Sequence, residues 1–216
     1  MPQELKTGVP FEKDGVRGFL HMPPRGGERG LVLTHGAGSN CGAPLLVAVA
    51  NAFCDDGIGV LRCDLPFRQK RPKGPPFPAM SAADREGLRS AAQALRALTP
   101  SRIYLGGHSY GGRQASILAA DEPKVADALL LLSYPLHPPN KPDQLRTEHF
   151  SKIRIPAVFV HGTADPFGTA AELELAVGAI PAPTRLLPIE GVGHDLKNGR
   201  FNLQAIIETL LEMDGD

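Results

Sequence analysis

The chain has 216 residues, of which 42% are hydrophobic and 21% are charged, and this composition is typical of a folded globular protein and excludes a disordered one. Its 23 Lys and Arg residues balance its 23 Asp and Glu residues, so the net charge does not attract the protein to nucleic acid or to an anionic membrane. The length predicts one domain over residues 1–216.

The N-terminal residues 1–15 contain charges, glycine and proline where a signal peptide has an apolar core, and no apolar run is long enough to span a membrane. Three cysteines cannot all pair, and a domain of this size does not need disulfides. These features predict a cytoplasmic protein without a membrane or nucleic-acid partner, and they leave its oligomeric state open.

Short apolar runs alternate with longer segments of helical spacing, which predicts an α/β fold with a mostly parallel sheet between two layers of helices. The expected strands are a weak antiparallel edge strand at 15–23 and strands at 30–34, 58–63, 102–107, 128–134, 157–162 and 184–189. The expected helices are 43–56, 81–98, 113–120 and two near 170–180 and 201–213.

Residues 64–80 are rich in proline, which predicts a long irregular loop. Long ordered loops often bind ligands, so we expect this one to form a wall or lid of a pocket, with a disordered surface excursion as the alternative. Its basic run includes Arg68 and Arg71 and is expected to be solvated near the mouth of the active site. The following helix is expected to be capped by Ser81, with Asp84 near its positive end.

The pentapeptide Gly107-His108-Ser109-Tyr110-Gly111 matches the pattern G-x-S-x-G directly after a predicted strand. A glycine-flanked serine alone is more often a tight structural turn. In this context it indicates a nucleophile on a strained turn, where the small neighbours avoid collisions with the strand and the helix.

A serine hydroxyl becomes a useful nucleophile when a histidine accepts its proton and a carboxylate orients that histidine. Asp165 follows the strand at 157–162, and His194 follows the strand at 184–189. The carboxyl ends of parallel strands meet at one edge of the sheet, so we predict a triad of Ser109, Asp165 and His194. As an alternative, Asp165 caps a helix. Asp195, beside His194, is expected to be a surface or capping residue rather than the triad acid.

Acyl transfer also requires two backbone N–H groups that point at the developing oxyanion. We expect one from Tyr110, which follows the serine, and one from Ala37 in the turn His35-Gly36-Ala37-Gly38, with Gly38 as the second choice. The histidines and cysteines show no compact ligand spacing, so no metal and no cofactor are expected. Cys54 and Cys63 are expected in the core, and Cys41 is the candidate for partial exposure.

The motifs THGAGSN, GGHSYGG, HGTADPFG and GVGHDL, over roughly residues 30 to 213, resemble the α/β-hydrolase superfamily, specifically its small dienelactone-hydrolase-like members without a cap domain. The run LRCDLPFRQKRPKGPP also resembles testis-expressed hydrolase-like proteins. Dienelactone hydrolase carries cysteine at the nucleophile position, where this chain has Ser109, so the resemblance does not extend to dienelactones as substrates.

These observations predict a serine hydrolase that cleaves carboxylic esters or related acyl bonds of a small molecule through an acyl-enzyme. The alternative is a binding or scaffold protein that keeps the fold without catalysis. A refinement of the first hypothesis is that Arg68 and Arg71 bind an anionic substrate.

Overall fold

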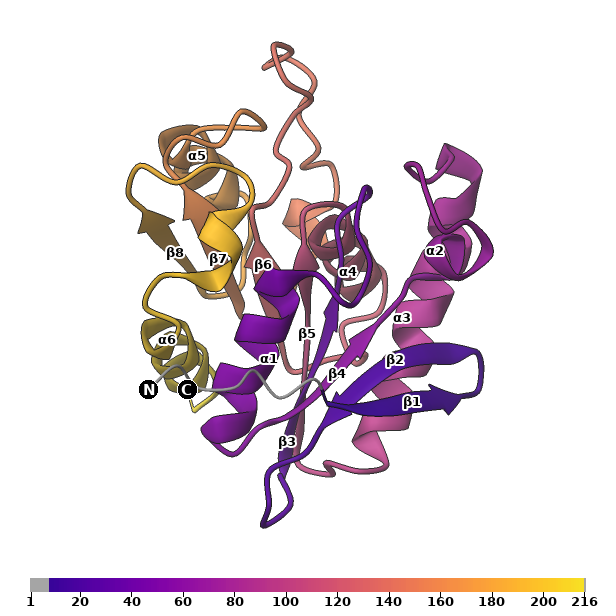
Figure 1. The fold of residues 1–216 in the computed structure, drawn as a ribbon. Coiled ribbons are helices and arrows are strands. Elements are labelled where there is room, and N and C mark those ends of the chain that lie inside the picture. Colours follow the sequence, from indigo (N-terminus) through magenta and orange to yellow (C-terminus); the bar gives the residue numbers. More distant parts are fainter. Residues whose placement is uncertain (1–7, 216) are drawn as a thin grey trace.

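The computed structural model describes residues 8–215, and its central feature is an eight-stranded sheet with the order β1-β2-β4-β3-β5-β6-β7-β8 (Figure 1). The strands are β1 (Val9–Lys13), β2 (Val16–His21), β3 (Arg29–Thr34), β4 (Gly59–Cys63), β5 (Arg102–His108), β6 (Ala128–Leu132), β7 (Ala157–Gly162) and β8 (Thr184–Ile189). Strands β3 to β8 run parallel, whereas β2 pairs antiparallel with both β1 and β4. The predicted mostly parallel sheet is therefore confirmed.

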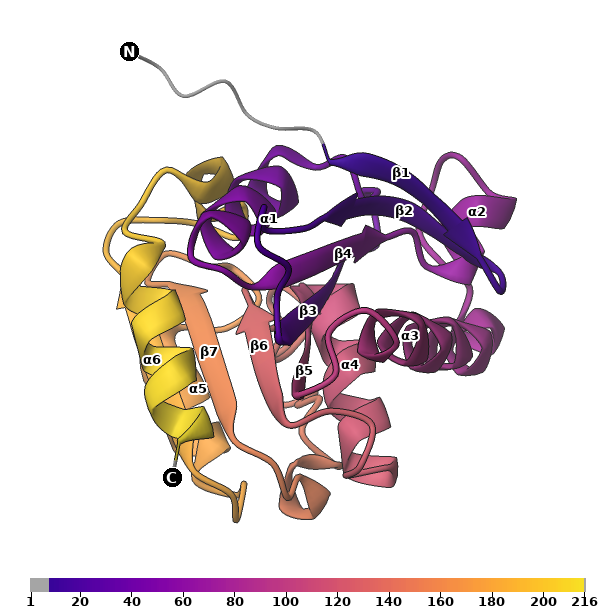
Figure 2. The same ribbon diagram turned by 90° about the horizontal axis from the view of Figure 1, so that it is seen from below.

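Helices cover both faces of this sheet. They are α1 (Pro44–Asp55), α2 (Pro66–Lys70), α3 (Ser81–Arg96), α4 (Tyr110–Asp121), α5 (Ala170–Val177) and α6 (Gln204–Asp214). Helices α1 and α6 pack in one apolar cluster, and α3, α4 and α5 pack in a second cluster across the sheet (Figure 2). This confirms the predicted three-layer α/β fold. Within residues 8–215, no helix has both the length and the apolar character needed to cross a bilayer.

The central strands are largely apolar because both of their faces are covered. All five residues of β6 are fully buried, and so are all six residues of β7. The parallel strands end at the upper edge in Figure 1, and the loops that follow them lie there. This edge is therefore the place where side chains from distant parts of the sequence can meet.

Several predicted boundaries need correction. The strand predicted at 15–23 is β2, which lies inside the sheet, and the exposed β1 forms the edge instead. Helix α4 begins at Tyr110 rather than at residue 113, and β6 ends at Leu132 rather than at residue 134. The backbone leaves β6 at Ser133, whose φ is 47°.

The prediction that residues 64–80 are irregular is wrong in part. This segment contains α2 and a short 3-10 turn, η1 (Pro78–Met80). Pro66 is the first residue of α2, where a missing N–H costs no hydrogen bond. Ser81 does not cap α3 but is its first residue, and its hydroxyl donates to the Pro78 carbonyl at 2.9 Å. Asp84 is fully buried and accepts a hydrogen bond from the Phe67 N–H at 2.9 Å, which ties α3 to α2.

His149 is buried beneath α4, where its Nε2 lies 2.8 Å from the Ser116 hydroxyl. Burial and, to a smaller extent, the charge of Arg113 lower the pKa of His149 from its usual 6.5 to about 4. The folded state therefore keeps this imidazole neutral between pH 4 and 6.5, while the unfolded chain takes up a proton. The free energy of unfolding must fall as the pH falls through this window.

We expect His149→Gln, which keeps a polar partner for Ser116, to remove this contribution. The loss of unfolding free energy between pH 7 and pH 5 should be smaller in the variant by about 2 kcal/mol. Urea titrations at both pH values measure it, and equal losses in the two proteins would show that His149 does not titrate on unfolding.

Candidate active site

Ser109 occupies the single position between β5 and α4 and has a φ of 52° and a ψ of −117°, an unfavourable backbone conformation for a residue with a side chain. A Cβ atom at Gly107 would lie 2.8 Å from the Gly111 carbonyl carbon. One at Gly111 would lie 2.6 Å from the His35 carbonyl oxygen. Both distances are too short for a side chain, so the two glycines let the strand, the turn and the helix pack closely enough to present Ser109.

The three predicted triad residues lie in one hydrogen-bonded chain. The Ser109 Oγ lies 2.8 Å from the His194 Nε2, and the His194 Nδ1 lies 2.7 Å from the Asp165 Oδ2. The Asp165 side chain is fully buried, whereas that of His194 is 22% exposed. This gradient leaves the carboxylate shielded from water and the serine end open to a ligand.

Neighbouring groups hold the carboxylate and the imidazole in place. The second oxygen of Asp165 accepts from the Phe167 N–H at 2.9 Å, and the Phe167 ring packs 4.3 Å from the His194 ring. The His108 Nε2 lies 2.7 Å from the His194 carbonyl oxygen. Burial lowers the pKa of His108 to about 4, so this ring is neutral near pH 7 and donates from Nε2. His161, in β7, donates to the Gly168 carbonyl at 2.8 Å and packs within the acid loop.

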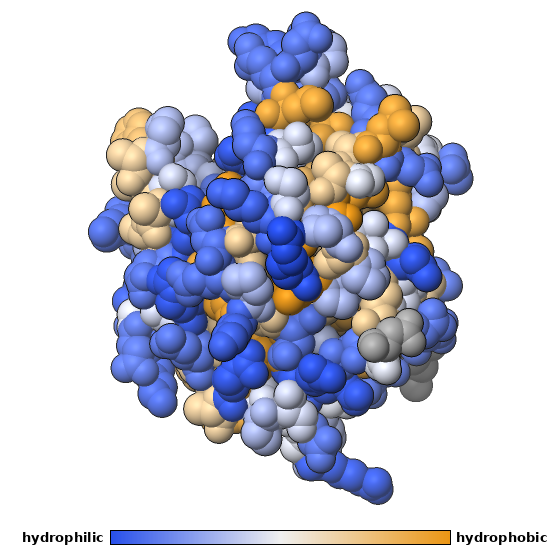
Figure 3. Space-filling view, turned by 180° about the vertical axis from the view of Figure 1, so that it is seen from behind, coloured by the Kyte–Doolittle hydropathy of each residue, from blue (hydrophilic) through white to orange (hydrophobic). Residues whose placement is uncertain are grey.

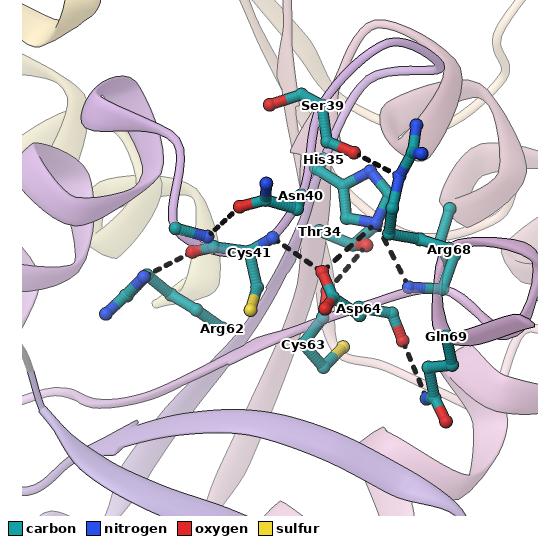
Figure 4. A network of polar contacts seen from close by, with 12 residues as sticks. Thr34, His35, Ser39, Asn40, Cys41, Arg62, Cys63, Asp64, Arg68 and Gln69 are labelled. Carbon is teal, nitrogen blue, oxygen red and sulfur yellow. Dashed lines mark hydrogen bonds and ion pairs between the residues drawn. The ribbon is translucent and has the colours of Figure 1, made fainter. Parts of the chain in front are cut away.

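A second group of contacts fixes the turn after β3 (Figure 4). The buried Arg68 donates from Nη2 to the Ala37 carbonyl at 2.8 Å and from Nε to the Ser39 carbonyl at 2.6 Å. Its guanidinium also donates to the carbonyls of Arg71 and Gly74. The turn that contains Ala37 is therefore held to the segment 66–74 by one arginine.

His35 and Asp64 complete this network. The Leu65 N–H donates to the His35 Nε2 at 3.1 Å, so the His35 Nδ1 carries the proton and donates to the Gly36 carbonyl at 2.9 Å. Asp64 accepts from the Cys41 N–H at 2.7 Å. His35 thus joins the turn to α2 as a structural residue.

The expectation that Cys41 is partly exposed is wrong. Its side chain is buried, and its carbonyl accepts from an Arg62 guanidinium nitrogen. Burial, together with Asp64, raises the pKa of the thiol to about 12. A thiol in this state is a poor nucleophile near neutral pH. Cys54 and Cys63 are also buried, as predicted.

Tyr110 ties the nucleophile turn to the helix layer. Its hydroxyl donates to the Asp84 Oδ2 at 2.7 Å, and its ring packs edge-on against Phe67 at 5.7 Å. Burial raises the pKa of Asp84, while its hydrogen bonds from Tyr110 and Phe67 oppose that rise. Tyr110 is the first residue of α4, so its N–H has no acceptor within that helix, as is general for first helical residues.

Ser109 lies in a pocket of about 430 Å³ whose walls come from several separate segments of the chain. The lining residues are Ala37, Pro75, Pro76, Phe77, Pro78, Ser81, Ser109, Tyr110, Arg113, Gln114, Pro135, Arg146 and Phe167. A larger hollow of about 720 Å³ lies between β2 and the end of α1, but none of the triad residues borders it. The Ser109 pocket is therefore the candidate site.

Two arginines predicted to contact substrate, Arg68 and Arg71, are not among the residues that line this pocket. Arg68 makes four hydrogen bonds to backbone carbonyls, and Arg71 stacks over the Phe77 ring at 4.3 Å. The pocket instead contains Arg113 and Arg146, which sequence analysis did not single out. Arg113 follows Ser109 by four residues, a helical spacing that would have placed it beside the serine.

Asp195, the other acidic residue beside His194, accepts from the Lys197 N–H at 3.2 Å and caps a short turn, η3 (Leu196–Gly199). Within residues 8–215, no cluster of three or more His, Cys, Asp or Glu side chains is arranged to hold a metal ion.

Comparisons with known proteins agree with this architecture. Among solved structures, dienelactone hydrolase from Anabaena variabilis is similar over 95% of this chain and 94% of its own, with 20% identity and a TM-score of 0.72. Est1E from Butyrivibrio proteoclasticus, solved with ferulic acid bound, matches over 97% of this chain and 100% of its own, with 18% identity and a TM-score of 0.73. An alpha-beta serine hydrolase homologue from Coxiella burnetii matches over 94% and 95%, with 16% identity and a TM-score of 0.71.

At these identities the structural matches establish the fold alone. The sequence adds a match of residues 27–210 to the family model of the alpha/beta hydrolase domain. Because this match covers most of the chain, the protein belongs to the alpha/beta hydrolase family.

Proposed function

We propose that this protein is a serine hydrolase that cleaves carboxylic esters of small molecules. The observation that carries the proposal is the hydrogen-bonded chain from Asp165 through His194 to Ser109, with its serine end in a pocket. A nucleophile within hydrogen-bond reach of a base, which a buried carboxylate orients, is the arrangement that activates a serine.

In the proposed reaction, the Ser109 Oγ attacks the carbonyl carbon while the His194 Nε2 accepts the hydroxyl proton. The imidazolium then donates this proton to the oxygen of the departing alcohol, and the C–O bond breaks to leave an acyl-enzyme. Water attacks this ester as His194 takes one of its protons, and return of that proton to Ser109 releases the acid. Asp165 stabilises the imidazolium in both halves of the cycle.

The N–H groups of Ala37 and Tyr110 are the proposed oxyanion hole. Both residues line the pocket with Ser109, and they come from the turn after β3 and from the start of α4. Arg68 and Asp84 hold these two segments through the contacts described above. Fixed N–H groups stabilise the oxyanion because they need no reorganisation during the reaction.

We expect a fluorophosphonate to label the wild-type protein once, at Ser109, and to leave Ser109→Ala unlabelled. Hydrolysis of 4-nitrophenyl butyrate should fall by roughly 10⁴-fold or more in Ser109→Ala and in His194→Gln, because these residues act as one unit. Asp165→Asn should lose about 10⁴-fold, since an amide favours the wrong tautomer of the imidazole. Intact mass spectrometry and steady-state kinetics provide these readouts.

Asp195→Asn is the matched control for Asp165→Asn, because it removes a carboxylate beside the same histidine without changing the triad. The activity of this variant should stay within about two-fold of wild type, as for most surface substitutions. A wild-type protein that is folded, takes up no fluorophosphonate and hydrolyses no ester would favour the scaffold alternative.

A separate prediction concerns Arg68. Arg68→Gln removes the donors to the Ala37 and Ser39 carbonyls, so the oxyanion turn should lose its fixed position. We expect kcat to fall by about 10- to 100-fold with a smaller change in KM, as when an oxyanion contact is weakened. The loss should be equal for neutral and anionic esters, because Arg68 does not line the pocket.

Lys73→Gln removes a positive charge from an exposed position in the same segment and should leave both constants unchanged. If Arg68→Gln weakened only the hydrolysis of anionic esters, Arg68 would be a substrate contact after all. Circular dichroism and melting temperature compare the fold of the two variants.

A further inference from the structure

The pocket beside Ser109 contains positive charge without a neutralising partner. Arg113 and Arg146 both line it, and no Asp or Glu residue is among its lining residues. Within the described part of the chain, neither arginine forms an ion pair. Glu148 is close enough to act electrostatically on Arg146, but its side chain is exposed and lies outside the pocket lining.

Arg113 lies in the first turn of α4, on the same side as Ser109. Its backbone N–H donates to the Ser109 carbonyl at 3.0 Å, which fixes the start of its side chain relative to the nucleophile. Its Nε is buried and has no hydrogen-bond partner among residues 8–215. Buried donors are normally satisfied, so this one indicates an acceptor that the folded chain itself does not provide. Asp84, the buried carboxylate of α3, already accepts from Tyr110 and Phe67.

Arg146 reaches the same pocket from the loop between β6 and η2 (Phe150–Lys152). Its backbone is fixed on both sides, because its N–H donates to the Leu136 carbonyl at 2.8 Å and its carbonyl accepts from the Tyr134 hydroxyl at 2.6 Å. Within the described residues, the one hydrogen bond of its guanidinium is long, 3.4 Å to the Pro135 carbonyl. The side chain is therefore positioned by its backbone and largely uncommitted at its charged end.

The two guanidinium groups are close enough to affect each other. Burial and then the charge of Arg113 lower the pKa of Arg146 below its ordinary value. Two cations held near one another in a partly buried pocket repel, and an anion between them removes that repulsion. The planar guanidinium matches a carboxylate in a two-point contact better than it matches any neutral group.

We propose that Arg113 and Arg146 bind a carboxylate of the substrate, so that this enzyme acts on esters of small molecules that carry a free carboxylate. The proposal rests on the proposed serine hydrolase function and names the substrate class of that same site. The apolar walls formed by Phe77, Pro135 and Phe167 would contact the hydrocarbon between the ester and the carboxylate. Figure 3 shows the molecule from behind the view of Figure 1. Most of this surface is hydrophilic, and apolar residues gather toward its upper part, the end at which the parallel strands terminate.

The substrates that test this are the mono-4-nitrophenyl esters of adipic, pimelic and suberic acids. Each is compared with the ester of equal length that ends in a primary amide. Shorter diacids are avoided because their own carboxylate attacks the ester. We expect kcat/KM to be about 10- to 100-fold higher for the acid than for the amide at the best chain length, the range expected for a charged hydrogen bond. Added salt should reduce this preference.

Arg113→Gln and Arg146→Gln should each lower the ratio of the two kcat/KM values, acid to amide, by about 10-fold or more. Arg185→Gln is the matched control, because it removes an exposed arginine at the other end of the sheet, near the start of β8, and should leave both values unchanged. A wild-type ratio near one at every chain length would overturn the proposal, and so would a ratio that neither pocket variant lowers.

Binding to Ser109→Ala separates this inference from the proposed function. Calorimetry compares monoethyl suberate, which keeps a carboxylate, with diethyl suberate, which does not. Tighter binding of the monoester that is lost in Ser109→Ala/Arg113→Gln supports the carboxylate site even if wild-type protein takes up no fluorophosphonate. Labelling at Ser109 combined with equal binding of the two esters would keep the hydrolase and remove the carboxylate site.

Discussion

The tight turn at Ser109 is the constraint on which the rest of the site depends. A non-glycine residue with a φ of 52° is strained, and it persists only because β5 and α4 are packed firmly on both sides of it. The close packing in turn excludes side chains at Gly107 and Gly111. It places the hydroxyl at the edge where β7 and β8 end, so the loops carrying Asp165 and His194 can reach it without any long excursion of the chain.

The turn after β3 requires a different device because it has no regular structure of its own. Its carbonyls would be free to reorient if they were solvated, and the proposed oxyanion N–H groups would move with them. Arg68 prevents this by donating to the Ala37 and Ser39 carbonyls from a buried position. The proline-rich segment 66–78 therefore acts on the site mainly through its backbone and this one side chain, and Phe77 and its neighbouring prolines add the pocket wall.

Hydrophobic periodicity was sufficient to predict the parallel sheet, its helix layers and the loops that carry the triad, because the buried central strands are mostly apolar. It failed where tertiary contacts override local preference. Helix α4 begins earlier than predicted. Gly111 and Gly112 are poor helix formers, yet these positions lack room for any side chain. Helix α2 was missed among prolines because its stabilising acceptor, Asp84, lies on another helix.

Tertiary contacts also explain why the wrong arginines were predicted to bind substrate. The sequence shows where basic residues cluster, but it does not show which of them line the pocket. A basic run draws attention in a sequence, but Arg68 within it is satisfied by backbone carbonyls and Arg71 lies over an aromatic ring. Arg113 and Arg146 stand alone in the sequence, and only the fold shows that both reach one pocket without a carboxylate beside them. A buried arginine whose N–H groups donate to the chain's own carbonyls stabilises the fold. An arginine that the chain holds in place without hydrogen-bond acceptors can bind a ligand.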